Sequence, residues 1–270
     1  MKFRLIIAFL SCLPLFCYCQ NGINEIGAKP TAMGNAYSTV NDQWGLFYNP
    51  GGLGRNEKTV AFSAFTNRYG ISGLNSLGAG FITNFTMGTL GVSAFKFGDD
   101  LYSEQIASLA YANSFGIASL GFRANYLQYN IEGMGTQGVV TLDFGGTATL
   151  TEQIRFGAYI RNINQAKVSS ITDERAPTIL YAGLGYQANE KLMLTAEAEK
   201  DIDLDARFKA GLEYKFLNKF FARTGVSTNE FTNFFGLGFI SQKLAIDYAL
   251  TWDTTLGLSH QASLSYTIKE

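Results

Sequence analysis

From residue 58 to the C-terminus, apolar and polar residues alternate in long runs. The clearest run covers residues 243–253, where Leu, Ile, Tyr, Leu and Trp alternate with Ala, Asp, Ala, Thr and Asp. Residues 204–216 and 258–268 repeat the pattern. Because successive side chains of a strand point to opposite faces, such runs predict strands with one apolar and one polar face.

Fourteen such strands are predicted, and the lengths of their connections alternate. Every second connection is very short, whereas the others are mostly longer, and the longest covers residues 163–177. Transmembrane barrels have an even strand number, short periplasmic turns and longer outer loops. The predicted strands are residues 58–66, 76–85, 87–97, 101–113, 116–129, 137–150, 153–162, 178–188, 191–200, 204–216, 219–228, 232–241, 243–253 and 258–268.

We therefore predict an all-β protein, a transmembrane antiparallel β-barrel of about 14 strands over residues 58–270. Nearly half of the chain is hydrophobic (47%), yet past residue 20 no stretch reaches the ~20 apolar residues that a spanning helix needs. Strands of about ten residues suit the apolar band of an outer membrane, whereas strands of soluble proteins average about five or six. We expect outer-membrane lipid to cover the apolar face and the N-terminus to lie in the periplasm of a Gram-negative bacterium.

The polar faces of these strands are expected to line the lumen. Their charges have mixed signs, so we expect a salt-bridged interior that fixes the barrel rather than a pore selective for one charge. The predicted lumen residues are Arg123, Asn125, Arg155, Arg161, Glu197, Glu199, Arg207, Lys209, Glu213, Arg223 and Asp247.

The first residues predict an export signal. Two basic residues precede an apolar run over residues 5–16, which is typical of a signal peptide covering residues 1–19. An alternative makes Cys17 or Cys19 a lipidated cysteine, although an aromatic residue precedes each. All three cysteines lie in residues 1–19, so the mature chain has none, which excludes disulfides and thiolate sites.

Residues 20–57 lack strand alternation. Partial helical spacing is interrupted by glycine and proline, and Asn49-Pro50-Gly51-Gly52 is a strong turn signal. An apolar, glycine-rich segment before the first strand is expected to form a plug inside the barrel, where its aromatic side chains would be buried.

This segment also resembles a known family. The stretch GAKPTAMGNAY at residues 27–37, followed by Asp42 and by LFYNPGGL at residues 46–53, is similar to the opening of FadL-like outer-membrane proteins, and most similar to the PorV/PorQ branch of Bacteroidota type IX secretion proteins. The residues that carry the motif are Gly27, Met33, Gly34, Ala36, Tyr37, Asp42, Trp44, Tyr48, Asn49, Pro50, Gly52 and Leu53.

The resemblance implies a fourteen-stranded barrel with a lumen plug, and it implies two different functions. The PorV/PorQ branch implies an accessory of type IX secretion or cell-surface attachment that contacts other secretion or surface proteins, and this is the main prediction. FadL itself implies the alternative, a passive conduit for hydrophobic small molecules such as fatty acids, with a lateral opening at a kinked strand. A barrel with a purely structural role is a third possibility. The candidate partner contact is the long loop with Asp173, Glu174 and Arg175, which is otherwise a solvated loop.

No motif predicts an enzyme, a cofactor or a metal site. His260 is the only histidine, and its neighbour Ser259 would point to the opposite face of the strand, so a serine–histidine–aspartate site is not formed. Asp201, Asp203 and Asp205 have the spacing of a calcium loop, but the glycine and glutamate that complete the loop are missing. The net charge of −1 and the lack of a basic run argue against nucleic-acid binding.

Overall fold

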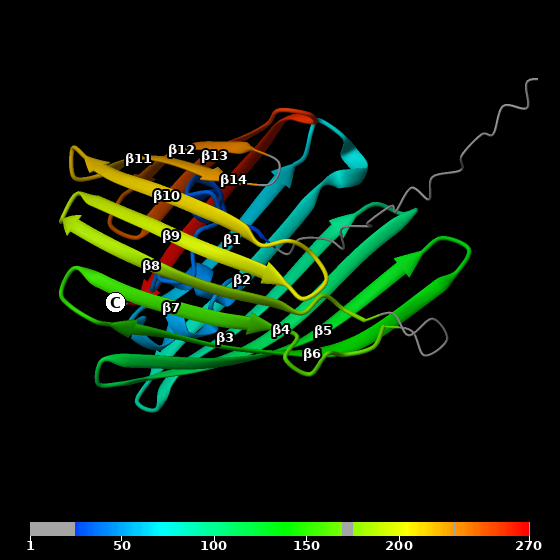
Figure 1. Ribbon diagram of the computed structural model, residues 1–270, viewed down its shortest axis with the longest axis horizontal. Coiled ribbons are helices and arrows are strands. Elements are labelled where there is room, and N and C mark those ends of the chain that lie inside the picture. Colours follow the sequence, from blue (N-terminus) through cyan, green and yellow to red (C-terminus); the bar gives the residue numbers. More distant parts are fainter. Residues whose placement is uncertain (1–24, 169–174, 229–230, 270) are drawn as a thin grey trace, which may run out of the picture.

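The computed structural model describes residues 25–168, 175–228 and 231–269, and the predicted signal peptide lies outside them. Fourteen antiparallel strands close into a barrel in which each strand pairs with its sequence neighbours and β1 pairs with β14 (Figure 1). The strands are β1 (Thr59–Asn67), β2 (Ser76–Phe85), β3 (Gly88–Gly98), β4 (Tyr102–Phe115), β5 (Ala118–Ile131), β6 (Gly135–Thr149), β7 (Ile154–Arg161), β8 (Ile179–Asn189), β9 (Leu192–Asp201), β10 (Arg207–Phe216), β11 (Phe220–Ser227), β12 (Thr232–Ile240), β13 (Leu244–Asp253) and β14 (Gly257–Lys269).

This architecture confirms the predicted fold class. All fourteen predicted strands are present, and their bounds agree with the structure to within three residues. The largest difference is at the start of β10, which begins at Arg207 rather than at residue 204. The Asp201 carboxylate accepts a hydrogen bond from the backbone N–H of Asp203 (2.9 Å), so the chain is still turning where alternation alone predicts a strand.

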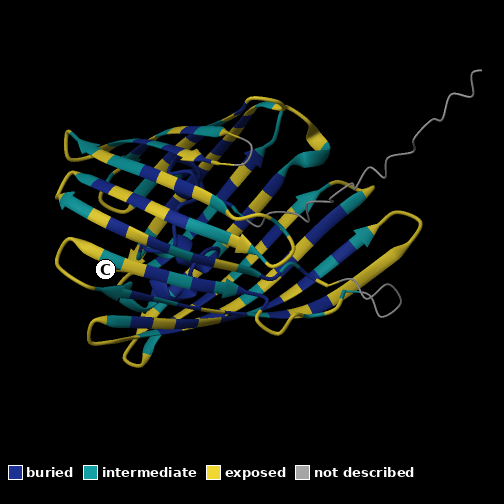
Figure 2. Cartoon of the chain, viewed as in Figure 1, coloured by how far each residue is buried: buried dark blue, intermediate teal, exposed yellow. Residues whose placement is uncertain are grey.

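Burial alternates along the strands, as Figure 2 shows. The outward positions are mostly apolar and exposed, and the inward positions are small, polar or charged. Leu184, Phe208 and Leu237, for example, are 54%, 60% and 62% exposed on the outer face. Such a belt of exposed apolar side chains is what a bilayer covers. Within the described residues, no helix has the length and apolar character needed to cross a membrane.

The wall of the barrel is uneven in height. β4, β5 and β6 have 14, 14 and 15 residues, whereas β7 has only eight. β6 therefore pairs with β7 only over Phe144–Thr149, and its outer part lies beside the connection that follows β7. There, the backbone N–H of Ile163 donates to the carbonyl of Leu142 (2.8 Å).

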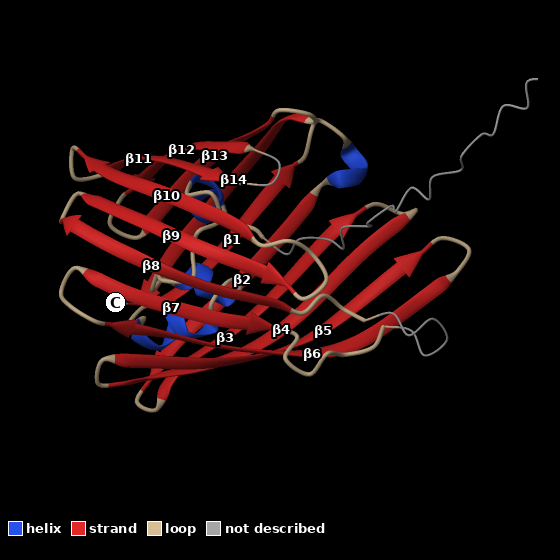
Figure 3. Cartoon of the chain, in the orientation of Figure 1, coloured by secondary structure: helices blue, strands red, loops and turns tan. Residues whose placement is uncertain are grey.

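Residues 25–57, here called the N-terminal segment, fold into short helices inside the ring of strands (Figures 1 and 3). They are α1 (Ala28–Ala32), η1 (Gln43–Leu46) and η2 (Pro50–Arg55). A further short helix, η3 (Ser72–Leu74), lies in the connection between β1 and β2. α1 contacts β11 to β14, whereas η1 and η2 contact β2 to β6, so the segment spans the lumen from one wall to the other.

The apolar outer face yields a first prediction. Leu184→Arg places a charge in the middle of the belt and, in lipid vesicles, should lower the free energy of unfolding by about 2–4 kcal/mol. Urea titration of the vesicle-inserted protein measures this change. Leu217→Arg is the control, because Leu217 is 79% exposed in the turn between β10 and β11 and its substitution should have little effect. Equal stabilities of the two variants would show that lipid does not cover this belt.

Candidate binding site in the barrel interior

Asp42 organises the first half of the N-terminal segment. Its carboxylate accepts hydrogen bonds from the backbone N–H of Trp44 (3.0 Å) and the hydroxyl of Tyr37 (2.6 Å), and it pairs with the ammonium of Lys29 (2.9 Å). One side chain thus caps η1 and ties it to α1 and to the turn between them. Trp44 packs over Gly27, where an added Cβ would lie 2.5 Å from the indole ring.

Asn49 organises the second half of the N-terminal segment, as Asp42 organises the first half. Its side-chain oxygen accepts from the backbone N–H of Gly51 (3.0 Å), which caps η2 at Pro50. Its amide group donates to the carbonyl of Ser38 (2.6 Å) and to the carbonyl of Gly146 on β6 (2.9 Å). Asn49 therefore joins two parts of the segment to the wall. The remaining motif residues are also buried, namely Met33, Gly34, Ala36, Tyr48, Gly52 and Leu53.

The predicted lumen charges form three groups. In the first, the Arg123 guanidinium pairs with Asp143 (2.8 Å) and donates to the carbonyl of Leu46, and Asn125 donates to the same carboxylate (2.8 Å). This group fixes η1 to β5 and β6. Asp143 was not among the predicted lumen residues, although it lies on an inward position of an alternating strand.

The second group surrounds Lys209. Its ammonium lies 2.6 Å from both Glu25 and Glu199, and Arg207 lies 4.0 Å from Glu199. Beside it, one carboxylate oxygen of Glu197 accepts the backbone N–H groups of Tyr37 (3.1 Å) and Ser38 (2.7 Å). A buried carboxylate on β9 thus satisfies two backbone donors of the N-terminal segment.

The third group joins Arg223 to Glu213 (2.5 Å) and to Asp247 (2.6 Å), with Lys29 of α1 at 4.0 Å from Glu213. Positive and negative side chains are therefore paired within the wall and with the segment. Arg155 is half-buried on β7.

The surroundings favour the charged forms of Glu25 and Lys29 in the N-terminal segment. Burial disfavours ionisation of Glu25, but the neighbouring Lys209 more than offsets it, and the pKa of the Glu25 carboxyl lies below its usual value. Burial likewise opposes the charge of Lys29, and Asp42 and Glu213 outweigh it, so the pKa of Lys29 is raised. Burial, followed by the charge of Asp42, raises the pKa of Tyr37 well above its usual value.

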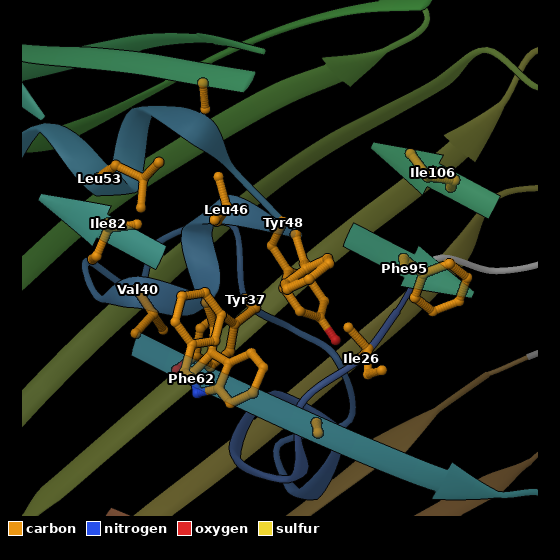
Figure 4. Packing of buried hydrophobic residues seen from close by; sticks show 14 of the residues in the cluster. Ile26, Tyr37, Val40, Leu46, Tyr48, Leu53, Phe62, Ile82, Phe95 and Ile106 are labelled. Carbon is orange, nitrogen blue, oxygen red and sulfur yellow. The ribbon is translucent and has the colours of Figure 1, made fainter. Parts of the chain in front are cut away.

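A pocket with a mainly apolar surface lies in the lumen between the N-terminal segment and β3 to β9. Its volume is about 100 Å³. Figure 4 shows Phe95 and Ile106 of this wall near Ile26 and Tyr48 of the segment. The apolar side chains that line the pocket are Leu46, Phe47, Phe95, Ile106, Leu127, Tyr129, Ala176, Ile179 and Tyr181.

Most polar groups at this pocket bind one another or the backbone, whereas the buried Nε atom of Arg161 has no hydrogen-bond partner among the described residues. Arg123 and Asn125 bind Asp143, the hydroxyl of Tyr102 donates to Glu104 (2.6 Å), and Arg161 donates to the carbonyl of Phe47 (3.0 Å). The guanidinium of Arg161 also lies 5.3 Å from the ring centre of Tyr181. The pocket can therefore hold a molecule that offers few hydrogen bonds of its own.

The sequence did not single out the apolar residues of the pocket, whereas four of its polar residues were among the predicted lumen residues, namely Arg123, Asn125, Arg161 and Glu199. The available signal was the outer part of β5, where Leu127 and Tyr129 take inward positions next to Asn125. There, the outward residues are Gln128 and Asn130, so the apolar face of the alternation turns inward. The alternating pattern was interpreted only as a lipid-facing apolar side and a polar lumen side. That interpretation assigns no function to apolar residues that face the lumen.

Other predicted positions lie elsewhere. Asp173 and Glu174 fall outside the described residues, whereas Arg175 is exposed and donates to Gln165 (3.2 Å). His260 is exposed on β14, with its Nδ1 atom 2.7 Å from the hydroxyl of Tyr248. In the described part of the chain, no three His, Cys, Asp or Glu side chains gather as a metal site would require.

No family model and no curated protein matches the chain. Solved structures do. Toluene transporter TbuX of Ralstonia pickettii is 14% identical, with 92% of this chain and 99% of that chain covered and a TM-score of 0.65. Toluene transporter TodX of Pseudomonas putida is 12% identical, with 89% and 97% covered and a TM-score of 0.66. A FadL homologue of Pseudomonas aeruginosa is 13% identical, with 90% and 98% covered and a TM-score of 0.60. At these identities the likeness shows the fold.

The position of Glu197 yields a second prediction. Glu197→Ala leaves the backbone N–H groups of Tyr37 and Ser38 without an acceptor and should destabilise the protein by about 1–3 kcal/mol. Trp44 lies in the segment, so its fluorescence in a Trp252→Phe background reports unfolding there. The control is Glu190→Ala, in the exposed turn between β8 and β9. An unchanged unfolding midpoint for Glu197→Ala would show that this carboxylate does not anchor the segment.

Proposed function

We propose that the protein is an outer-membrane conduit for small apolar molecules, which is the alternative of the two functions implied by the sequence motif. The observation that carries the proposal is the mainly apolar pocket between the N-terminal segment and β3 to β9. The fold shared with two toluene transporters and a FadL homologue supports it.

The size and lining of the pocket favour a compact ligand. An apolar cavity of about 150 Å³ takes up benzene in another protein, and this pocket, at about 100 Å³, is smaller, so a single ring is the upper limit of what it can hold. Its aromatic side chains, among them Phe47, Phe95 and Tyr181, offer flat apolar surface. We therefore expect molecules with a single ring or a similarly short alkyl group to bind better than long acyl chains.

The uneven wall offers a way out of the pocket. The pocket is bordered by Asp143 on β6 and Arg161 on β7, close to where their pairing ends at Phe144. Beyond that point, strand pairing is reduced to one backbone hydrogen bond, from Ile163 to Leu142, and two bonds of a side chain: Asn164 accepts from the N–H of Leu142 (2.9 Å) and donates to the carbonyl of Val140 (3.0 Å). We infer that this seam, formed by residues 140–142 of β6 and residues 162–164, is the side opening through which an apolar molecule passes between lumen and membrane.

The two ends of the barrel support a proposal for its orientation. The turn between β2 and β3 and the turn between β4 and β5 have two residues each, whereas residues 162–178 connect β7 to β8 at the opposite end. Short turns face the periplasm in outer-membrane barrels. With a signal peptide at residues 1–19, we propose that the mature N-terminus is periplasmic and that the seam lies toward the outer leaflet.

The type IX secretion role gains no support from the structures described above, which are channels and transporters or a FadL homologue. We rank it second, together with contacts to secretion or surface proteins through Asp173, Glu174 and Arg175. The secretion role predicts that the native barrel, when it is extracted in mild detergent, carries secretion components in stoichiometric amounts. The non-enzymatic role stays a prediction and agrees with the channel fold.

The pocket can be tested by filling it. Leu127→Trp places an indole in the pocket and should weaken binding of toluene to the purified barrel about tenfold or more, because a ~1.4 kcal/mol loss already has that effect. Uptake of radiolabelled toluene by intact cells should fall in parallel. The matched control is Leu120→Trp on the same strand, since Leu120 is 44% exposed on the outer face and Leu127 is 7% exposed. If wild-type protein neither binds nor takes up toluene, the conduit proposal is wrong.

The seam can be tested by closing it. A disulfide between Leu142→Cys and Ile163→Cys would join the two sides, and oxidation should reduce toluene uptake about tenfold, with recovery after reduction. Ala158→Cys with Ala182→Cys is the control, because these residues face each other across β7 and β8, away from the seam. Unchanged uptake by the oxidised seam variant would exclude this opening.

A further inference from the structure

A second pocket of the lumen, here called the polar pocket, has a more polar lining than the apolar pocket. It lies between the N-terminal segment and the strands β1 and β10 to β14, and its volume is about 280 Å³. Seven of its twenty lining residues are threonine or serine, against two of the twenty that line the apolar pocket. Tyr69 and Leu74 of the β1–β2 connection border it, so it lies toward the end of the barrel opposite the two-residue turns.

A buried group of charged side chains separates the two pockets. Glu25 lines both of them, whereas Lys209 lines only the polar pocket and Glu199 only the apolar one. The ammonium of Lys209 lies 2.6 Å from both carboxylates. The two pockets therefore lie on either side of this ionic group and can be occupied independently.

Two neighbouring rows of side chains form the barrel side of the polar pocket. In one row, Phe234 of β12 lies opposite Thr251 of β13, which lies opposite Ser259 of β14. Two residues further along β14, Gln261 lies opposite Thr66 of β1. Because residues two positions apart share a face of a strand, both rows face the lumen. One wall of the pocket thus combines an aromatic ring with hydroxyl and amide groups.

Gln261 and Thr66 have polar atoms that the protein does not satisfy. The Nε2 atom of Gln261 and the Oγ1 atom of Thr66 are buried, and neither has a hydrogen-bond partner among the described residues. The two side chains are only 4% and 7% exposed. Leaving a buried polar group unpaired is costly, so both residues would gain from a ligand that donates and accepts hydrogen bonds.

The charges at the polar pocket balance one another. Three cationic side chains line it, and three carboxylates either line it as well or lie beside one of these cations. The cations are Arg68, Arg207 and Lys209, and the carboxylates are Glu25, Glu199 and Asp253. With equal numbers of opposite charges, the pocket favours a neutral ligand over an ion.

We propose that the polar pocket is a second binding site, which takes a neutral polyhydroxylated molecule of about the size of a monosaccharide. A sugar ring offers hydroxyl groups to Gln261 and Thr66 and a face of C–H groups to the ring of Phe234. A cavity of about 150 Å³ takes up benzene in another protein, so a pocket of about 280 Å³ has room for a six-membered ring with its hydroxyl groups. The site is additional to the proposed conduit for apolar molecules and does not depend on it.

Equilibrium dialysis tests whether the site exists. The purified full-length barrel, in a detergent without a sugar headgroup, is dialysed against radiolabelled D-glucose, D-galactose or myo-inositol. At least one of these probes should bind saturably, with one molecule per barrel, and inorganic phosphate at the same concentration should not displace it. If none of the three binds saturably below about 10 mM, or if radiolabelled phosphate binds in their place, the proposal is wrong.

Two variants locate the bound probe. Gln261→Leu and Thr66→Val remove groups that have no partner among the described residues, so the unfolding midpoint should not fall, whereas the probe should bind about tenfold more weakly. The control is Gln105→Leu, since Gln105 is exposed on β4, away from the polar pocket. Unchanged affinity of both pocket variants would place the probe elsewhere and overturn the assignment.

Leu127→Trp separates the polar pocket from the conduit. This variant fills the apolar pocket, so its affinity for toluene should fall while its affinity for the sugar probe stays within about twofold of the wild type. Gln261→Leu should have the converse effect. Loss of probe binding in Leu127→Trp would show a single shared pocket and overturn the second site, whereas a wild type that binds the probe but not toluene overturns the conduit alone.

Discussion

The close approach of two backbones, segment against wall, is the constraint on which the rest of this structure depends. Outward positions of the strands are mostly apolar, whereas many inward positions beneath the segment are glycines, as at Gly157 and Gly225. A larger inward residue would push the segment away and open the barrel from within. Side chains alternate along the strands because their two faces have different surroundings: the outer face meets an apolar environment, and the inner face packs against a folded part of the same chain.

The packed segment and the apolar pocket are parts of one arrangement. η1 contributes Leu46 and is followed by Phe47, and both side chains line the pocket from the segment's side. Arg123 and Arg161, which face the same pocket, donate to the carbonyls of these two residues. The contacts that seat the segment therefore also satisfy the polar groups around the pocket, and an apolar surface is left for a ligand.

Strand positions could be predicted because alternation and turn residues act locally. β13 and β14 follow from their own residues, and the even strand count follows from the alternating lengths of connections. The motif at residues 27–53 could be noticed, but its contacts could not be derived. Which glycine lies beneath Ser38, and that Glu197 binds its N–H, depend on how residues more than a hundred positions apart meet in the closed barrel. The apolar lining of the pocket could not be predicted from the sequence for the same reason, because Phe95, Ile106 and Leu127 come from three different strands.

The short strand β7 leaves the barrel wall incompletely paired next to the pocket. A strand of eight residues beside one of fifteen leaves part of β6 without a strand partner, and an unpaired edge in contact with lipid is costly unless another group satisfies it. The Asn164 amide supplies that group, with one acceptor and one donor placed as a strand residue would place its own. A side chain can rotate away and return, whereas a strand ladder has to break several bonds together. The barrel is thus closed by strand pairing around most of its circumference, whereas next to its apolar pocket it is closed by the Asn164 side chain and one backbone hydrogen bond, from Ile163 to Leu142.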